Sequence, residues 1–139
     1  MDSASIFLPS LSLMLGTYLV LVLIPWQRFR SYFRHEVGPE DFKCGESNRV
    51  PEAVLRPNRV FMNLLEMPVM FYAVSTMIFV TGRVDGIFIA LAWCYVGLRA
   101  VHALVFLIRN SIFFRFLSFG ISNVALLAML IRFTAMISE

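Results

Sequence analysis

Long apolar segments alternate with short polar ones along the 139-residue chain. The apolar segments cover residues 6–26, 59–81, 87–108 and 112–136, with boundaries that are approximate. Each has about 20 residues or more, enough for an α-helix to cross about 30 Å of hydrocarbon at 1.5 Å per residue. The pattern predicts a single all-α domain over residues 1–139, an integral membrane four-helix bundle surrounded by the lipid bilayer.

Composition supports a membrane protein over a soluble one. Hydrophobic residues make up 59% of the chain and charged residues 15%, whereas a soluble domain is about half apolar and about a quarter charged. The net charge is only +3, and the basic residues alternate with acidic ones, so a nucleic-acid partner is not expected. Cys44 and Cys94 form no CxxC pair and lie in different environments, so we expect neither a disulfide bridge nor a metal site.

The distribution of arginine and lysine predicts how the helices are oriented. No basic residue precedes the first apolar segment and three arginines follow it, the reverse of a cleaved signal peptide, so we expect this helix to be retained. Residues 27–58 carry six basic residues, while the turn at 82–86 carries one. Basic loops stay in the cytoplasm. We therefore expect the loop 27–58 and the turn 109–111 to be cytoplasmic, with both termini on the outer side.

Polar side chains inside the apolar segments are unusual, because a lone ionisable group in hydrocarbon costs several kcal/mol. Arg59, Asn63 and Glu66 are spaced i, i+4 and i+7, which places them within an arc of roughly 60° on one helix. Arg99 and His102 are three residues apart and share a face of the third helix. Arg115 opens the fourth helix, after a tight turn. These groups are predicted to meet at one depth near the cytoplasmic end.

Structural roles could account for each of these residues separately. Arg59, Asn63 and Glu66 could form a buried hydrogen-bonded network that fixes helix packing, with Glu66 paired to Arg99. Arg115 could be a topology-setting arginine that reaches the headgroups, and a lone histidine is more often packed than catalytic. The surplus of arginines over carboxylates needs another explanation. It suits a small anionic ligand, since guanidinium groups bind carboxylates in bidentate fashion and favour a nearby thiolate.

Several motifs together resemble those of a known family. The run Arg59-x-x-x-Asn63-x-x-Glu66-x-Pro68 is similar to the signature of the MAPEG superfamily, membrane-associated proteins in eicosanoid and glutathione metabolism. The stretch 58–73 resembles a bacterial branch of that superfamily. Arg99-x-x-His102, with Arg115 thirteen residues after the histidine, agrees on the third and fourth helices. The resemblance spans essentially the whole chain.

The resemblance implies a homotrimer in the bacterial inner membrane, with glutathione bound at the cytoplasmic side between neighbouring subunits. It implies that Arg115 stabilises the glutathione thiolate. It further implies that six residues hold the tripeptide or shape its pocket: Arg28, Arg59, Asn63, Glu66, Arg99 and His102. Three positions depart from the family pattern: Phe106 and Phe119 stand where tyrosines are frequent, and Phe116 where some members have serine.

Three functional hypotheses follow. The first is a glutathione-dependent transferase or peroxidase that acts on small lipophilic electrophiles, with glutathione as co-substrate. The second is a non-catalytic membrane protein that binds a lipid or lipid-like acid between subunits, favoured by the three phenylalanines. The third is an ion or proton pathway through Glu66 and His102, which lacks the chain of acidic groups that a relay across the membrane needs.

Overall fold

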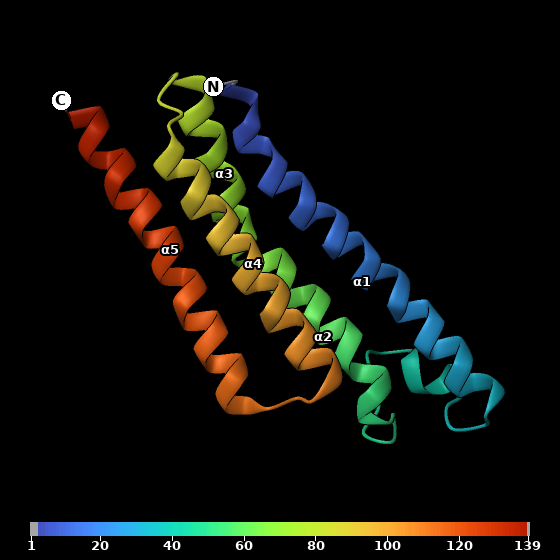
Figure 1. Cartoon of the computed structure of the whole chain (residues 1–139). Coiled ribbons are helices and arrows are strands. Elements are labelled where there is room, and N and C mark those ends of the chain that lie inside the picture. The colour runs from blue at the N-terminus through green and yellow to red at the C-terminus, as the bar shows by residue number, and fades with distance from the viewer. Residues whose placement is uncertain (1–2, 139) are drawn as a thin grey trace.

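The computed structural model describes residues 3–138, and every regular element in that part of the chain is helical. In chain order the elements are η1 (Ser3–Ile6), α1 (Phe7–Phe33), η2 (Pro39–Phe42), α2 (Glu52–Glu66), α3 (Pro68–Val80), α4 (Gly86–Ile108) and α5 (Ile112–Ser138). η1 leads directly into α1, and α2 leads into α3. Together with α4 and α5 these elements therefore form four segments of 31, 29, 23 and 27 residues (Figure 1). All four are long and apolar enough to cross a membrane, which confirms the predicted all-α four-helix membrane bundle.

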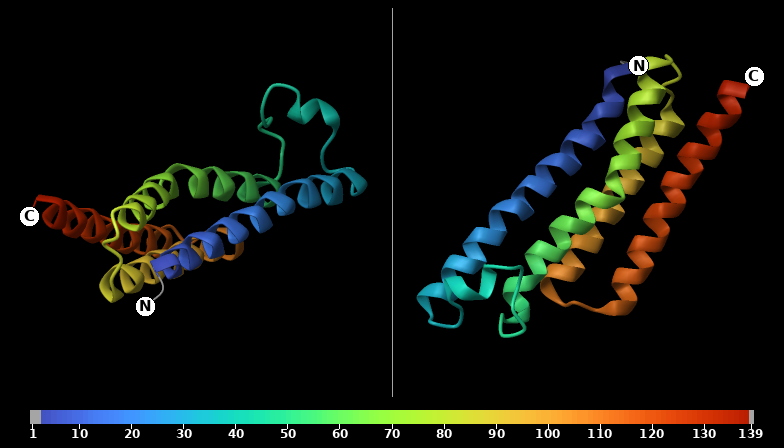
Figure 2. Two further views of the ribbon diagram at one scale, coloured as in Figure 1. Left: turned by 90° about the horizontal axis from the view of Figure 1, so that it is seen from above. Right: turned by 180° about the vertical axis from the view of Figure 1, so that it is seen from behind.

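The helices run alternately up and down, so the connections fall at two opposite ends of the bundle. α1 begins and α5 ends beside the α3–α4 connection, and we call this the terminal end (Figure 1). Residues 34–51 and the α4–α5 turn, residues 109–111, lie at the opposite end, which we call the loop end. From above, the segment between α1 and α2 stands away from the four helices (Figure 2). The two loops predicted to be cytoplasmic thus share one end.

The first two helices are longer than their apolar segments. α1 continues to Phe33 instead of ending near Trp26, and α2 begins at Glu52 instead of Arg59, so the loop is shorter than the predicted 27–58. The apolar run measures the part of a helix that fits hydrocarbon, but a helix can continue into water with polar residues. α1 ends only where His35 takes a positive φ of 57°, followed by glycine and proline at 38–39.

The second membrane segment is interrupted near its middle. Pro68 has no backbone N–H, and its ring disfavours helical geometry for the residue before it. The helix is broken at Met67, and α2 and α3 follow one another as separate helices. The break affects the candidate site, because the last turns of α2 carry Asn63 and Glu66.

The hydrophobic core contains fully buried residues from α3 and α4. Ile78 and Phe88 are fully buried, and the rings of Phe71 and Tyr95 stack with their centroids 4.6 Å apart. The outward faces of all four segments carry exposed large apolar side chains, for example Leu15 at 67% and Leu127 at 54% exposure. Such faces suit a lipid environment, in which apolar side chains on the outside carry no penalty.

An ion pair fastens the terminal end. The Asp85 carboxylate caps α4 by accepting a hydrogen bond from the Phe88 amide at 2.9 Å, and it also pairs with Arg132 of α5. Burial by itself would raise the pKa of Asp85, but the hydrogen bonds from Phe88 and Arg132 outweigh it and hold the pKa below its ordinary value. The pair joins the α3–α4 connection to the last helix.

The segment at the loop end has a small core of its own. Val37, Val50 and Val54 pack together and away from the main core. Asp41 accepts hydrogen bonds from the Gly38 amide at 2.9 Å and from the Ser47 hydroxyl at 2.6 Å. These two bonds hold the pKa of Asp41 below its ordinary value. The segment is therefore folded by its own contacts, and Val54 connects its small core to the start of α2.

Candidate functional site

A hollow of about 320 Å³ opens between α2, α4 and α5 near the loop end. Its lining residues are Asn63, His102, Ile112, Arg115, Phe116 and Phe119. Three polar residues that were proposed from the sequence therefore meet here, one from each helix. The other lining residues, Ile112, Phe116 and Phe119, are apolar, so the hollow offers both charged and apolar surface.

Arg115 enters the hollow from the first turn of α5. Its Nη1 donates a hydrogen bond to the Asn110 side-chain oxygen at 2.6 Å, and its guanidinium lies 3.3 Å from the centre of the Phe106 ring. Its Nε has no hydrogen-bond partner among residues 3–138. The guanidinium is thus held from one side and keeps donor capacity for a ligand.

His102 lies beside it with a defined tautomer. Its Nδ1 is 2.9 Å from the carbonyl oxygen of Arg115, which can only accept a hydrogen bond, so Nδ1 carries the proton. Nε2 is then the unprotonated nitrogen of the neutral ring, and it has no partner within the described chain. The hollow is therefore lined by a histidine, whose buried Nε2 lacks a partner within the described chain, next to a guanidinium.

Arg99 lies behind the hollow and does not line it. The residue has 0% exposure near the middle of α4, and its Nη2 donates a hydrogen bond to the Asn63 carbonyl at 2.7 Å, one turn before the break at Pro68. Its guanidinium is 5.4 Å from the centre of the Phe119 ring and 6.0 Å from that of Tyr95. Its positive charge lies within the bundle beneath the hollow's aromatic wall.

Two of the three phenylalanines that depart from the family pattern contact arginines through their ring faces. Phe106 lies under Arg115, and Phe119 lies between Arg99 and the hollow. Aromatic faces attract cations through the ring quadrupole. A tyrosine at either position would add a hydroxyl group. The phenylalanines instead stabilise the arginines by cation–π contacts alone and leave the surroundings of the hollow more apolar.

The remaining α2 residues of the predicted cluster lie on the outside of the single chain. Arg59 and Glu66 are exposed, on either side of half-buried Asn63. No ion pair joins Glu66 to Arg99 or to Arg59 within residues 3–138, so the buried pairing that the sequence left open is not formed. The arc of roughly 60° on α2 that holds these three residues therefore lies at the edge of the hollow, and Arg59 and Glu66 turn outward from it.

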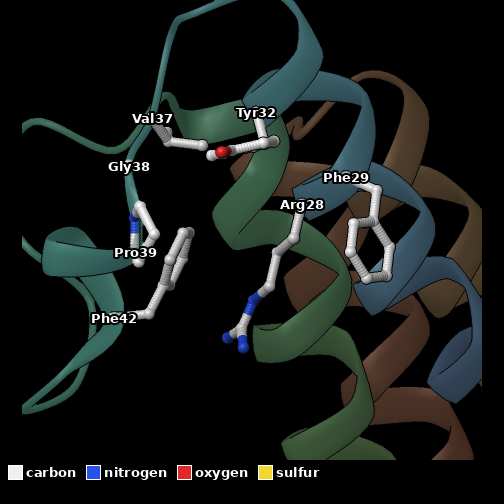
Figure 3. A pocket seen from close by; sticks show the side chains of 7 residues that line it. All are labelled: Arg28, Phe29, Tyr32, Val37, Gly38, Pro39 and Phe42. Carbon is white, nitrogen blue, oxygen red and sulfur yellow. The ribbon is translucent and has the colours of Figure 1, made fainter.

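Arg28 is separated from the hollow by its own partners at the end of α1. Its Nη2 donates a hydrogen bond to Glu46 at 3.2 Å, and Glu46 also accepts one from the Asn58 side chain at 3.1 Å. Figure 3 shows Arg28 extending from α1 beside Phe42, whose ring centre is 4.5 Å from the guanidinium. Within one subunit, Arg28 connects the folded loop to α1 and does not reach Arg115.

The sequence model of the MAPEG family matches residues 6–135, nearly the whole chain. The chain belongs to the MAPEG family. This MAPEG protein is an integral membrane protein of the kind found in eicosanoid and glutathione metabolism. The comparisons matched it to no curated protein and to no solved structure.

The hollow of the MAPEG protein is suited to an anion with an apolar partner. Neither Arg99 nor Arg115 has a carboxylate within ion-pairing distance in residues 3–138. No group of three histidine, cysteine or acidic side chains in that range is placed to hold a metal ion. The chemistry available is therefore positive charge, a histidine acceptor nitrogen and an aromatic wall.

Sequence reasoning missed two residues that shape the site of the MAPEG protein. Asn110 was noticed only as part of a tight turn, and Glu52 was placed in a loop. The structure connects both to Arg115 through side-chain hydrogen bonds. The sequence indicated the turn but not the side-chain contact. Asparagine is favoured in turns because of the backbone conformations that it adopts, whatever its side chain contacts.

Proposed function

We propose that this MAPEG protein is a glutathione-dependent membrane enzyme, a transferase or peroxidase that acts on small lipophilic electrophiles. The observation that carries the proposal is Arg115, which lines the hollow without a carboxylate partner, beside His102, whose buried Nε2 has no hydrogen-bond partner within the described chain. In this proposal the loop end faces the cytoplasm of a bacterium, glutathione enters from there, and the electrophile arrives sideways from the inner membrane.

Arg115 and His102 would activate the thiol together. Nε2 of His102 accepts the thiol proton or hydrogen-bonds to it, and the Arg115 guanidinium stabilises the thiolate that remains. A positive neighbour lowers the pKa of a thiol, and the thiolate is the reactive form. Asn63 borders the same hollow and can hydrogen-bond to the peptide groups of glutathione, while Arg99 adds positive potential from behind Phe119.

Either reaction then proceeds from the thiolate. In conjugation, its sulfur attacks an electrophilic carbon, an S–C bond forms and the leaving group departs with the bonding electrons. In peroxide reduction, the sulfur attacks the terminal peroxide oxygen, so that an S–O bond forms as the O–O bond breaks, and an alcohol and a sulfenic acid result. A second glutathione then forms the disulfide and water, so two thiols reduce one hydroperoxide. Phe116 and Phe119 supply the apolar wall against which the lipophilic reactant lies.

The proposal includes a homotrimer, because one subunit leaves part of the predicted set unused. Arg59 and Glu66 lie exposed on α2, and Arg28 lies apart at the end of α1. A neighbouring copy that packs on α2 would cover this face and bring its own Arg28 toward the hollow. Native mass spectrometry in mild detergent tests the assembly, and a stable monomer or dimer contradicts it.

The test of function is the ultraviolet thiolate signal of glutathione added to the purified wild-type protein in nanodiscs. S-methylglutathione, which has no thiol, gives the baseline. Arg115→Ala should abolish the signal and the turnover of an aryl halide. Arg109→Ala is the matched control, since Arg109 is an exposed arginine in the neighbouring turn, and it should retain both.

Two results would contradict the proposal. A wild-type protein that gives no thiolate signal at millimolar glutathione is not a glutathione enzyme. A signal that persists in Arg115→Ala would show that the thiolate is stabilised elsewhere, so the role given to Arg115 would be wrong.

A second function, the binding of a lipid or lipid-like acid without catalysis, is favoured by the apolar character of the hollow. Phe106, Phe116 and Phe119 remove three hydroxyl positions from its surroundings and leave Arg115 as a partner for an acidic headgroup. Native mass spectrometry with a mixture of fatty acids distinguishes the two. Retained fatty acid that excess glutathione does not displace favours this alternative.

A further inference from the structure

The side chain of Asn110 connects two charged residues at the loop end of the bundle. Its Nδ2 donates a hydrogen bond to Glu52, the first residue of α2, and its Oδ1 accepts the bond from Arg115. Both ends of one amide are therefore used, one toward a carboxylate and the other toward a guanidinium. The three side chains form a line from α2 through the α4–α5 turn to α5.

The backbone holds this amide in place. Asn110 has a positive φ of 51°, a left-handed conformation that asparagine adopts more readily than most residues. Its N–H donates to the Val105 carbonyl at 2.8 Å, which fixes the turn to the end of α4. Glu52 is held in turn by Arg56, whose Nε donates to the same carboxylate at 3.3 Å. A long arginine side chain is thus attached to a short and well-anchored one.

We propose that Asn110 positions Arg115 for catalysis as a neutral spacer between Arg115 and Glu52; this inference rests on the proposed glutathione function. Arginine loses considerable rotamer freedom when it is fixed, so a catalytic guanidinium benefits from being held before the ligand arrives. A carboxylate in direct contact could hold it equally well, but would neutralise the charge that the thiolate needs. The Asn110 amide bonds to both side chains and thereby keeps the Glu52 carboxylate away from the Arg115 guanidinium.

Two variants separate holding from neutrality. Asn110→Gly removes the side chain and tolerates the positive φ. It should lower kcat about tenfold, the loss expected for one charge-assisted hydrogen bond, with a smaller change in KM for glutathione. The double variant Asn110→Asp/Glu52→Gln keeps the line of hydrogen bonds but moves the carboxylate onto Arg115. It should fold as the wild type does, yet raise the pKa of the bound thiol by about one unit.

The readouts are kcat, KM and the pH titration of the glutathione thiolate signal, measured on the full-length protein in nanodiscs. Asp85→Asn is the control, because it breaks a polar contact at the terminal end. It should lower the melting temperature without moving kcat or the thiol pKa. If Asn110 had only a structural role, Asn110→Gly would lower the melting temperature without changing kcat or the thiol pKa, as the control does. The double variant would then match the wild type in every readout.

The outcomes distinguish this inference from the function on which it rests. A wild-type protein without a thiolate signal overturns the proposed function and the positioning role together. A wild-type signal whose pKa and kcat are unchanged in Asn110→Gly overturns the positioning role alone. If Asn110→Gly does not fold, the double variant decides, and a thiol pKa equal to that of the wild type overturns the inference.

Discussion

The burial of Arg99 leads to a prediction about stability that can be worked out from its contacts. The side chain is fully buried near the middle of α4, and only Nη2 has a hydrogen-bond partner within the described residues. Replacing it by methionine, Arg99→Met, removes the charge and keeps an unbranched side chain of similar length. The expected result depends on whether the buried charge is part of an ion pair.

The opposing contributions nearly cancel. An arginine near the centre of a membrane helix costs about 3 kcal/mol. The charge-assisted hydrogen bond to the Asn63 carbonyl offsets about 2 kcal/mol of this, and the contacts with Phe119 and Tyr95 offset about 1 kcal/mol more. Arg99→Met should therefore change the free energy of unfolding by no more than about 1 kcal/mol. Breaking a buried ion pair with Glu66 would instead cost about 3–5 kcal/mol.

Unfolding in mixed micelles of increasing SDS content, followed by circular dichroism, measures this difference. Leu104→Met, on an exposed face of the same helix, controls for the new side chain and should leave stability unchanged. A loss of 3 kcal/mol or more in Arg99→Met, on the buried-pair scale, would refute the reasoning. It would show that Arg99 has a carboxylate partner in the membrane that one chain alone does not reveal.

The same variant should affect ligand binding more than folding. A charge roughly 10 Å from a bound anion contributes about 1.5 kcal/mol at an effective dielectric constant near 20. Glutathione affinity should therefore fall about tenfold in Arg99→Met, and Arg99→Lys should retain most of it. Equal affinity in both variants would mean that Arg99 does not contribute to the potential of the hollow.

Three further predictions concern other parts of the molecule. Asp85 has a lowered pKa in the folded protein, so its pair with Arg132 should stabilise the bundle above the ordinary value of 3.8 and lose this effect as the pH falls below it, measured as melting temperature against pH; Asp85→Asn should reduce the dependence and leave the part due to Asp41. A membrane-impermeant maleimide should label Cys44 in inverted vesicles but not in intact cells, and Cys94, within a membrane-spanning helix, in neither; rapid labelling of Cys44 in intact cells contradicts the orientation. Phe119→Tyr should strengthen glutathione binding severalfold by placing a hydroxyl at the hollow, and unchanged binding in calorimetry contradicts the proposed site.

The number and order of the membrane helices could be predicted because hydrocarbon imposes a minimum apolar length. The helix ends could not, since water places no such limit on residues 27–33, which continue α1 with arginine and aromatic side chains. The break at Met67 was not predicted, because the apolar pattern indicates one helix over residues 59–81 although Pro68 lies inside them. Its consequence, a carbonyl at Asn63 bonded to Arg99, depends on how α2 and α4 pack together.

The candidate site, like the fold, could be predicted only in part. Helical spacing placed Asn63, His102 and Arg115 at one depth, and the structure brings them to one hollow. Spacing says which residues share a helix face, but the rotation of each helix in the bundle decides whether that face turns inward. Asn110 acts through a side chain held by a turn that connects helices, a role that periodicity does not report.

The position of Glu66 links the fold to the assembly. It lies in the membrane-spanning segment Glu52–Val80, on the loop-end side of the break at Met67, and its side chain is exposed on the surface of the single chain. A carboxylate that faces hydrocarbon is unfavourable, by up to about 3 kcal/mol. Lipid is therefore a poor neighbour for this face of α2, and a protein surface that donates hydrogen bonds is a good one. The same contact would cover the open side of the hollow that holds Arg115. Self-association would therefore both shield the Glu66 carboxylate from lipid and complete the site.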